Sequence, residues 1–539
     1  MKKYRMFFLT TGIFVLFAVL FIIIESYPNF PDADSFYHAK MAVIIRDQGF
    51  IKTFPWFQET IFTEHYVDHH LLYHLLLIPF VTIFNPLTGI KVAAVIFALM
   101  ALGGFYFLLR TWKIPWAPWL TLAAGLSVSF FQRLALPRAP SLSLLCLLLG
   151  TWALVERKPR WLLVIAAVFV WLYNGWPLLA ALIPCLIIGK LLTRQIFSTE
   201  QKFWGNFAVI IKEERKIILA LLIGLGLGLI SHPYFPENLK FSILHILQIG
   251  FFNATNTNIP VGTEWYPPNI WWTLMNNPLI VLIIFLTGAT FLPMLAKKDQ
   301  KKLRTQEYST VEKILVISLM TAGTIIFTLK SQRYFEYSIP FVVLTAGLFL
   351  ALTQDFFQQE IGPELKKLWQ GPIKKTISIS FVILIIALSC HKVWGSTKPI
   401  DDYFQAQQFA AATNWIKEHV PANTTIFHNC WDYAPILWYL DDTYYYLVGL
   451  DPMFMVDKNP ERFQLWLALS QGRDTDVEKI ISEFNAPVVV VDNRMNDAET
   501  LIKNLLLSGL FTEVTSNEWV RIFATNEFLY ENSHNSANS

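Results

Sequence analysis

The amino-acid sequence predicts a polytopic α-helical membrane protein with about eleven spans, counts up to 13 remaining open, followed by a C-terminal α/β domain. Apolar residues make up 54% of the 539 residues and charged residues only 15%, against roughly 25% charged residues in soluble domains. Apolar runs of about 17–20 residues recur, and each is long enough to cross a hydrocarbon core. The chain from residue 394 onward is polar by comparison.

The first apolar run covers about residues 6–25 and follows Lys2, Lys3 and Arg5. It is longer than a signal-peptide core and lacks a small-residue cleavage site, which predicts a retained helix with a cytoplasmic N-terminus. Further spans are predicted at about 90–109, 116–132, 141–155, 161–173, 176–192, 217–231, 278–295, 313–329, 335–352 and 375–392.

The orientation depends on the short apolar segment 70–84, which holds two histidines and Pro79. If this segment does not span, nearly all basic loops fall on the N-terminal side, in agreement with the positive-inside rule. Residues 1–393 then form a transmembrane domain of the plasma (inner) membrane. Its long first loop (26–89), its loop 232–277 and the C-terminal domain are predicted to be extracytoplasmic.

Residues 394–539 are predicted to form a soluble α/β domain. Amphipathic helical stretches at 404–420 and 476–484 are mixed with strand-like runs at 444–450, 486–493 and 518–525. At about 140 residues the region can bury its own core. The low-complexity tail from about 531 is predicted to be disordered.

Acid and imidazole side chains crowd the first external loop. Asp34 directly follows the first span, and a second group contains Glu64, Asp68, His69, His70 and His74. Ionisable residues at a membrane are costly and are kept mainly where they pair, bind a metal or do chemistry. On a helix, His70 and His74 share a face, as two ligands of one ion would. The alternatives are that Asp34 caps a helix and that the histidines hydrogen-bond locally.

Glu264 lies in the proline-stiffened loop segment VGTEWYPP, where a rigidly held acid suits a metal or a polar substrate group. Arg133, Arg138 and Arg333 break the positive-inside trend, and such exceptions favour a functional role. A guanidinium group suits a pair of phosphate oxygens. The alternatives are a solvated loop acid and, for Arg333, an ion pair with Glu336 or snorkelling.

The segment HNCWDYAP follows a predicted strand and brings an aromatic residue and an acid, Trp431 and Asp432, to a turn. Trp431 as an ordinary core residue is the alternative. No disulfide framework or metal site follows from the spacing of the four cysteines.

Together these residues resemble the motifs of the catalytic subunit of oligosaccharyltransferase, of the bacterial and archaeal single-subunit type, which has the GT-C membrane glycosyltransferase fold. Asp34 in DSFYH is similar to the family's first acidic motif, and Glu264 in TEWYPP to its fifth-loop glutamate, which contacts metal and acceptor amide. Arg333 matches an arginine that meets the lipid pyrophosphate, and Arg133 one that precedes the second acidic motif. The remaining match is to the WWDYG motif, which reads the acceptor sequon: Trp431, Asp432 and Tyr433.

The sequence departs from this pattern in two places. No acid follows Arg133, where the family has an acid-x-acid pair, so the missing ligands of a cation must come from elsewhere. The predicted metal ligands are Asp34, Glu264, Asp68, Glu64, His69 and His70, and Mg²⁺ or Mn²⁺ is the expected cofactor. Cys430 and Ala434 replace two residues of WWDYG, which puts an asparagine acceptor in question.

The resemblance implies a metal-assisted, inverting glycosyltransferase that moves a glycan from a polyprenyl-(pyro)phosphate donor to a protein, lipid or glycan acceptor on the outer membrane face. Asp34 and Glu264 are the expected catalytic residues. Arg333 and Arg133 are expected to bind the donor phosphate, and the residues 431–433 to bind the acceptor.

Two alternatives remain open. One is a GT-C enzyme that transfers a single sugar from a polyprenyl monophosphate to a hydroxyl group. The other is a non-enzymatic polytopic transporter, against which the few ionisable groups at mid-depth of the spans argue. A net charge of +3 gives no indication of a nucleic-acid partner.

Overall fold

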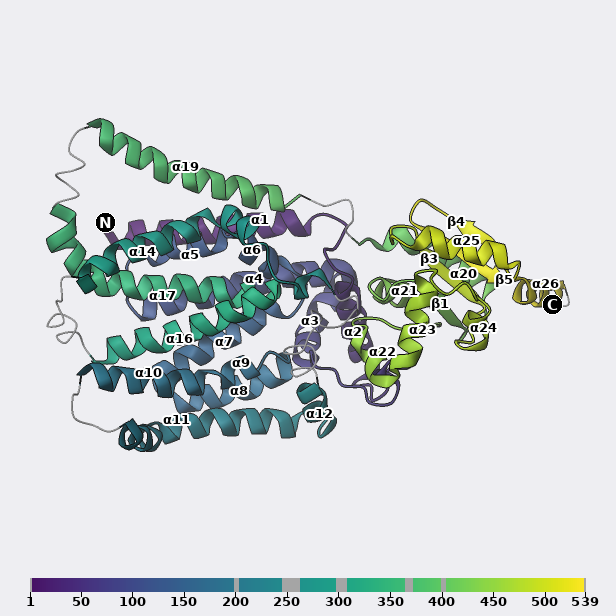
Figure 1. The fold of residues 1–539 in the computed structure, drawn as a ribbon, viewed down its shortest axis with the longest axis horizontal. Coiled ribbons are helices and arrows are strands. Elements are labelled where there is room, and N and C mark those ends of the chain that lie inside the picture. The colour runs from purple at the N-terminus through teal and green to yellow at the C-terminus, as the bar shows by residue number, and fades with distance from the viewer. Residues whose placement is uncertain are drawn as a thin grey trace.

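The computed structural model describes residues 2–197, 203–244, 262–296, 308–363, 372–398 and 404–537. It consists of a bundle of long, roughly parallel helices with a smaller α/β part at one end (Figure 1). Part of the predicted outer loop 232–277, residues 245–261, lies outside the described residues.

Up to residue 396, the described part of the chain is mainly helical. Outside residues 26–89, the predicted first external loop, these helices form the bundle or connect within it. They are α1 (Lys2–Glu25), α4 (Pro86–Thr111), α5 (Ala117–Gly125), α6 (Val128–Ala135), α7 (Pro140–Val155), α8 (Pro159–Leu172), α9 (Pro177–Ala180), α10 (Leu182–Phe197), α11 (Phe203–Ser231), α12 (Glu237–Leu244), α13 (Ile270–Asn276), α14 (Pro278–Ala296), α16 (Tyr308–Lys330), α17 (Phe335–Phe356) and α19 (Pro372–Ser396). The first external loop carries α2 (Asp34–Gln48) and α3 (Leu71–Ile83).

Fewer helices qualify as membrane spans than the sequence predicts. By length and apolar composition, six of the described helices can cross a membrane, or up to eight if each of two sharply bent helix pairs is one span, against about eleven predicted. The predicted segments do lie in helices, but several of these are short. The 14 residues of α8, for example, extend only about 21 Å at 1.5 Å per residue, which is less than a hydrocarbon core of about 30 Å.

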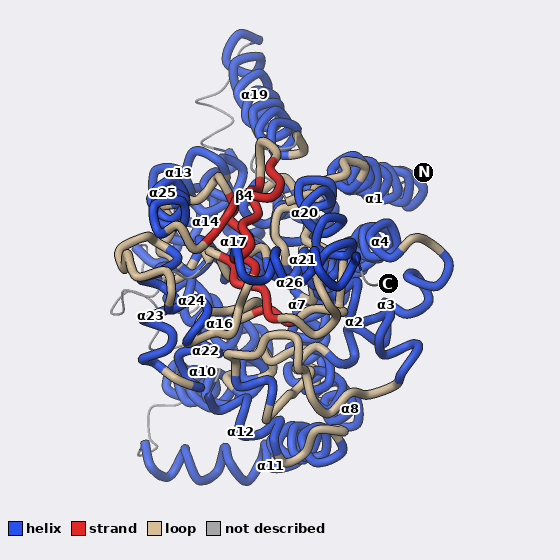
Figure 2. Tube along the Cα trace, turned by 90° about the vertical axis from the view of Figure 1, so that its right-hand side faces the viewer, coloured by secondary structure: helices blue, strands red, loops and turns tan. Residues whose placement is uncertain are grey.

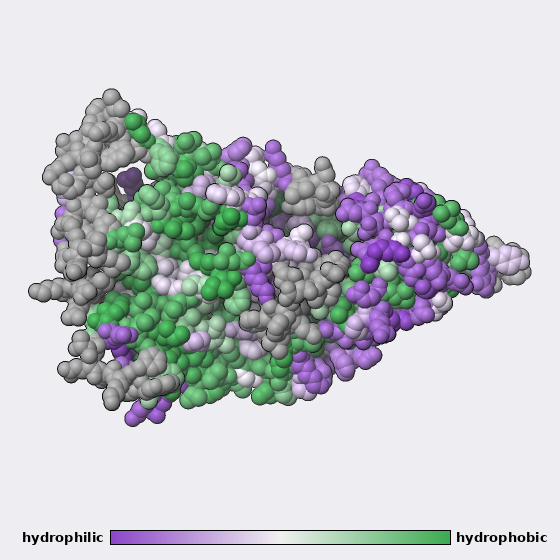
Figure 3. All heavy atoms as spheres, viewed as in Figure 1, coloured by the Kyte–Doolittle hydropathy of each residue, from purple (hydrophilic) through white to green (hydrophobic). Residues whose placement is uncertain are grey.

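The surface of the bundle is that of an integral membrane protein. Apolar residues cover most of its visible side, whereas polar residues cover most of the C-terminal part (Figure 3). Large apolar side chains of α1 and α19 are exposed, Phe7 to 64% and Ile383 to 59%, and lipid is the solvent that tolerates such a surface. The segment 70–84 forms the helix α3, whose 13 residues are too few to span alone.

The C-terminal part is built around one mixed five-stranded sheet in the order β2-β1-β3-β5-β4. Its strands are drawn in red in Figure 2. Strands β2, β1 and β3 pair in parallel, and β3, β5 and β4 pair antiparallel. The elements are α20 (Ala406–His419), β1 (Thr425–His428), α21 (Ala434–Leu440), β2 (Tyr445–Tyr446), α22 (Met453–Lys458), α23 (Pro460–Ser470), α24 (Lys479–Ser482), β3 (Val488–Asp492), α25 (Ala498–Ser508), β4 (Phe511–Ser516), β5 (Val520–Thr525) and α26 (Asn526–Ala537).

Strand β3 explains the layers of this part. Its side chains alternate between the two faces of the sheet, so Val488 and Val490 join the core that contains Phe409 of α20, whereas Val489 and Val491 join the core that contains Trp466 of α23. Both faces are therefore covered by helices, which is why the strand reads as a continuous apolar run. The predicted C-terminal α/β fold is confirmed.

The tail differs from the prediction. Helix α26 continues to Ala537, where the sequence predicts disorder from about 531. The helix starts on a side-chain cap, because the hydroxyl of Thr525 accepts a hydrogen bond from the backbone N–H of Phe528. A helix nucleated in this way at the end of β5 extends into a segment whose composition alone does not favour it.

The C-terminal part docks on the first external loop. The backbone N–H groups of Gln58 and Glu59 donate to the carbonyls of Tyr446 and Leu447 at 2.8 and 2.9 Å, which extends the β2 edge of the sheet. The Arg462 guanidinium group pairs with Glu59 at 2.8 Å. The loop thus connects the bundle to the sheet and leaves a cavity between them.

Candidate functional site

A cavity of about 730 Å³ lies where the first external loop, the α6–α7 turn, the loop before α13 and the C-terminal part meet. Its lining includes most residues that the sequence analysis singled out: Asp34, His69, His70, Arg133, Glu264, Arg333, Trp431 and Asp432. Together with the turn before α17 that holds Arg333, five segments that are far apart in the sequence contribute to a single site.

Asp34 is the first residue of α2, where the positive end of the helix dipole favours a carboxylate. It does not serve as the cap, because Asp32 accepts hydrogen bonds from the backbone N–H and the hydroxyl of Ser35 at 3.1 and 3.2 Å. The Asp34 carboxylate instead pairs with a guanidinium nitrogen of Arg138 at 2.9 Å. Burial raises the pKa of Asp34 to about 6, although Arg138 opposes the shift.

Glu264 lies in the short 3-10 turn η3 (Thr263–Trp265) and faces three arginines. Its carboxylate oxygens lie 2.5 Å from Nη1 of Arg133, 3.6 Å from Nη1 of Arg138 and 3.8 Å from Nη1 of Arg333. Burial alone would raise the pKa of Glu264, but the three guanidinium groups hold it well below its usual range. Glu264 is therefore an anion at neutral pH.

A second short turn, η4 (Gln332–Tyr334), holds the Glu264 loop in place. The Ser331 hydroxyl donates to the Glu264 carbonyl at 2.8 Å, and the Gln332 side-chain amide donates to the Thr263 carbonyl at 2.6 Å. These bonds join the start of α17 to the loop before α13. They explain why Glu264 and Arg333, both predicted as site residues, lie next to each other.

The arginines have distinct partners. Arg133 of α6 donates to the buried Glu336 at 3.0 and 2.8 Å, so Glu336 pairs with Arg133 and not, as in the alternative considered for Arg333, with that residue. Arg333 stacks on Trp265, with 4.2 Å from Cζ to the ring centre, and donates to the Tyr173 hydroxyl at 2.8 Å. Planar guanidinium groups fixed in this way are suited to phosphate oxygens.

The sequence marks Arg138 as an exception to the positive-inside trend but does not assign it to the site. Arg138 lies in the turn between α6 and α7, in the segment that lacks the expected acid pair. Its guanidinium group contacts Asp34 and Glu264 and lies 3.7 Å from Asp32. Arg138 thus lies between the two predicted catalytic acids and contacts both of them.

The residues predicted to hold a cation are not gathered into one set. Asp34 and Glu264 share the cavity with His69 and His70, but Glu64 is exposed, and the buried Asp68 is turned to His74. Among the described residues, no group of three or more His, Cys, Asp or Glu side chains is arranged to hold a metal ion. Mg²⁺ is typically bound by one or two carboxylates together with waters and substrate phosphates, but here the two cavity carboxylates, Asp34 and Glu264, are both paired with arginines.

The turn after β1 brings two of the three predicted acceptor residues to the cavity. Trp431 and Asp432 line it, and burial raises the pKa of Asp432 to about 7, with the charges of Asp34 and Asp32 adding to the shift. Tyr433 does not line it. Its buried hydroxyl lies 2.8 Å from the Asn429 side-chain oxygen.

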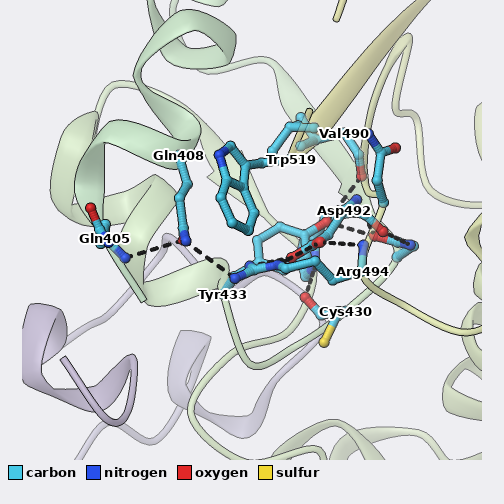
Figure 4. Close-up of polar contacts among 12 residues, drawn as sticks. Gln405, Gln408, Cys430, Tyr433, Val490, Asp492, Arg494 and Trp519 are labelled. Carbon is cyan, nitrogen blue, oxygen red and sulfur yellow. Dashed lines mark hydrogen bonds and ion pairs between the residues drawn. The ribbon is translucent and has the colours of Figure 1, made fainter. Parts of the chain in front are cut away.

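Tyr433 lies inside the C-terminal part, beside Asp492, Arg494 and Trp519 (Figure 4). Its hydroxyl is 3.0 Å from the Val490 carbonyl, and its ring stacks on Phe409 with centres 4.9 Å apart. These contacts join the turn to β3 and α20. Tyr433 therefore holds the turn that presents Trp431 and Asp432.

No family model and no curated protein matches the chain, but solved structures do. Archaeal oligosaccharyltransferase AglB from Archaeoglobus fulgidus, in complex with an inhibitory peptide and a dolichol-phosphate, has a TM-score of 0.57 at 12% identity, over 95% of this chain and 73% of that one. A structure of that organism's oligosaccharyltransferase with Zn and sulfate has a TM-score of 0.52 at 11% identity, over 95% and 73%.

Two further matches carry other names. ArnT from Cupriavidus metallidurans, bound to undecaprenyl phosphate, has a TM-score of 0.51 at 13% identity, over 95% of this chain and 97% of that chain. A mutant of the arabinofuranosyltransferase AftD from Mycobacteria has a TM-score of 0.52 at 12% identity, over 96% and 41%. At such low identity these likenesses concern the fold. The chain has a GT-C-like fold.

Proposed function

We propose that this protein is a glycosyltransferase that moves a sugar or glycan from a polyprenyl-(pyro)phosphate donor to an acceptor on the extracytoplasmic face of the plasma membrane. The observation that carries the proposal is the convergence of two carboxylates, Asp34 and Glu264, with three guanidinium groups on one cavity. Two proteins of similar fold, AglB and ArnT, have structures with a polyprenyl phosphate bound, which supports a donor of that class.

In this proposal the arginines hold the donor phosphate. Arg333, fixed by Trp265 and Tyr173, and Arg138 stabilise the negative charge that develops on the phosphate oxygen as its bond to the anomeric carbon breaks. Arg133 donates hydrogen bonds to Glu264 and Glu336 and thereby helps to hold the charged side chains of the site in position.

The two carboxylates act on the acceptor side. Asp34 and Glu264 orient the nucleophile opposite the departing phosphate, and a direct displacement without a covalent enzyme intermediate inverts the anomeric centre. Trp431 and Asp432 on the opposite segment of the lining contact the acceptor. A divalent cation stays a prediction, and none of these steps is assigned to one.

A single-sugar transfer from a polyprenyl monophosphate remains the second candidate. The name of the AftD match, an arabinofuranosyltransferase, supports it, as does the altered WWDYG segment at Cys430 and Ala434. The transporter alternative has no comparable support, because the ionisable residues of the site lie at the loop side of the bundle.

We expect Asp34→Asn and Glu264→Gln each to lower transfer from an undecaprenyl-phosphate-linked hexose by at least about 10²-fold, because each removes a charge that orients the acceptor. Purified protein is assayed with a mixed set of peptide, lipid and glycan acceptors, and expression should stay normal. Asp47→Asn is the matched control, because Asp47 is exposed and pairs with the adjacent Arg46. Wild-type rates in both variants would falsify the assignment.

Transfer is also expected to fall as the pH drops through about 6. The folded-state pKa of Asp34, about 6, lies above the ordinary value of 3.8, so acidification protonates this carboxyl and weakens its ion pair with Arg138. A raised carboxyl pKa means that protonation does not by itself destabilise the fold. We therefore expect kcat/KM to drop between pH 7 and pH 5 before the melting temperature does; a flat kcat/KM over this range would contradict the assigned role.

A further inference from the structure

A hydrogen-bonded chain of three side chains reaches the cavity and has no part in the steps above. Nδ1 of His74 lies 2.7 Å from Oδ2 of Asp68, and Nε2 of His74 lies 2.8 Å from Nδ1 of His38. Asp68 and His74 are completely buried, whereas His38 also lines the cavity. The arrangement therefore connects a buried carboxylate to the site through two imidazole rings.

The direction of these hydrogen bonds follows from the chemistry of the groups. Burial would raise the pKa of Asp68, but the His74 contacts lower it below its usual value, so Asp68 is a carboxylate and can only accept. Its Oδ1 accepts from the backbone N–H of His70 at 3.0 Å, which leaves Oδ2 for His74.

With neutral imidazoles, the proton of His74 is then on Nδ1, and its Nε2 must accept from Nδ1–H of His38. His38 is left with a lone pair on Nε2. In the part of the chain that the structure describes, this nitrogen has no hydrogen-bond partner.

The position of His38 relative to Asp34 is set by one helix. The two residues are four apart on α2 and share a face, and both line the cavity. His70 lies on the same wall, its ring centre 4.9 Å from that of His38. His70 is 8% exposed, and its buried Nδ1 has no hydrogen-bond partner among the described residues.

We propose, as an extension that rests on the proposed function, that His38 accepts the proton of a hydroxyl acceptor and that His74 and Asp68 position it. The acceptor oxygen forms a bond to the anomeric carbon, and the bond from this carbon to the phosphate oxygen breaks. The electron pair of that bond leaves with the phosphate, and the hydroxyl proton passes to Nε2 of His38. The acceptor class is therefore an alcohol of a sugar, a lipid or a protein side chain.

The chemistry of the base favours this class over an amide. An imidazole oriented by a carboxylate is the arrangement that removes a proton from a hydroxyl in Ser-His-Asp sites. The lone pair of an amide nitrogen is delocalised into the carbonyl group, so this nitrogen is a weaker nucleophile than a hydroxyl oxygen. Proteins of this fold therefore need not share one acceptor.

Asp68→Asn is the most specific test, because asparagine has the same shape as aspartate and should reverse the direction of the hydrogen bonds from residue 68 through His74 to His38. Oδ1 of the new amide keeps the His70 N–H, and its NH₂ group donates to Nδ1 of His74. The proton of His74 then lies on Nε2 and donates to Nδ1 of His38, so that Nε2 of His38 carries a hydrogen and can accept nothing. We expect kcat to fall by about 10²–10⁴-fold, with an unchanged donor KM.

Tautomers provide a readout that does not depend on activity. In protein with ¹⁵N-labelled histidine, Nε2 of His38 is expected to be unprotonated in the wild type and protonated in Asp68→Asn, its signal being assigned by its loss in His38→Gln. An identical tautomer in both proteins would overturn the hydrogen-bond chain. His65→Gln is the matched control, because His65 lies in the same loop, and its side chain is 65% exposed.

His38→Ala completes the design. Its transfer to an octyl glycoside should fall by about 10²–10⁴-fold and recover in part when imidazole is added, while His65→Gln stays at the wild-type rate. Wild-type transfer with an unchanged His38→Ala rate would overturn this inference alone, as would transfer to an Asn-X-Thr peptide but not to the glycoside. A wild-type protein that consumes no undecaprenyl-phosphate-linked hexose with any acceptor would overturn the proposed function, and this inference with it.

Discussion

Replacing Arg138 with methionine is expected to destabilise the protein by roughly 3–5 kcal/mol and to abolish transfer. The substitution removes the direct partner of the largely buried Asp34, and breaking such an ion pair from one side costs about that much. Glu264 keeps its pairs with Arg133 and Arg333. The loss of a positive charge also weakens the proposed phosphate site. Thermal unfolding in detergent and transfer from an undecaprenyl-phosphate-linked hexose measure the two effects.

The control for this substitution is Arg46→Met, because Arg46 pairs with the adjacent Asp47 at the surface of α2. Arg138→Lys separates charge from geometry, since a single ammonium group cannot reach both carboxylates as a planar guanidinium group does. We expect it to retain part of the stability and little of the transfer. A melting temperature of Arg138→Met equal to that of wild type would contradict the bridging role.

Truncating Trp438 to alanine is expected to cost about 3–5 kcal/mol, because it leaves a large cavity in a fully packed place. This tryptophan of α21 is completely buried, and its ring lies 5.0 Å from that of Phe54, 5.3 Å from that of Trp56 and 5.8 Å from that of Tyr37. All three partners belong to the first external loop. The substitution should therefore loosen the docking of the C-terminal part on the bundle.

Limited proteolysis measures that loosening, as faster release of a soluble C-terminal fragment, together with a lower melting temperature. The matched control is Trp415→Ala on α20, whose side chain is only partly buried and stacks on His419. Equal cleavage rates in wild type and Trp438→Ala would show that the aromatic cluster does not hold the two parts together.

Local properties of the sequence were sufficient for the general architecture. Long apolar runs, the valines of β3 and the amphipathic stretch of α20 each depend on neighbouring residues, and such patterns can be read directly. The number of spans could not be read in the same way. Helices such as α8 are apolar enough to be counted but too short to cross, and a bend such as that between α6 and α7, 110°, is set by packing.

For the site, the sequence by itself determined which residues carry its charge: Asp34, Glu264, Arg133 and Arg333 stand out because ionisable groups beside apolar spans are rare. Only the tertiary structure decided their partners. Arg133 meets Glu336 across 203 residues, and His38 meets His74 across 36. Contacts over such separations depend on how helices and loops pack, and no local pattern records them. For that reason Asp68, a predicted metal ligand, lies instead at the end of a histidine chain, and Arg138 joins the two acids.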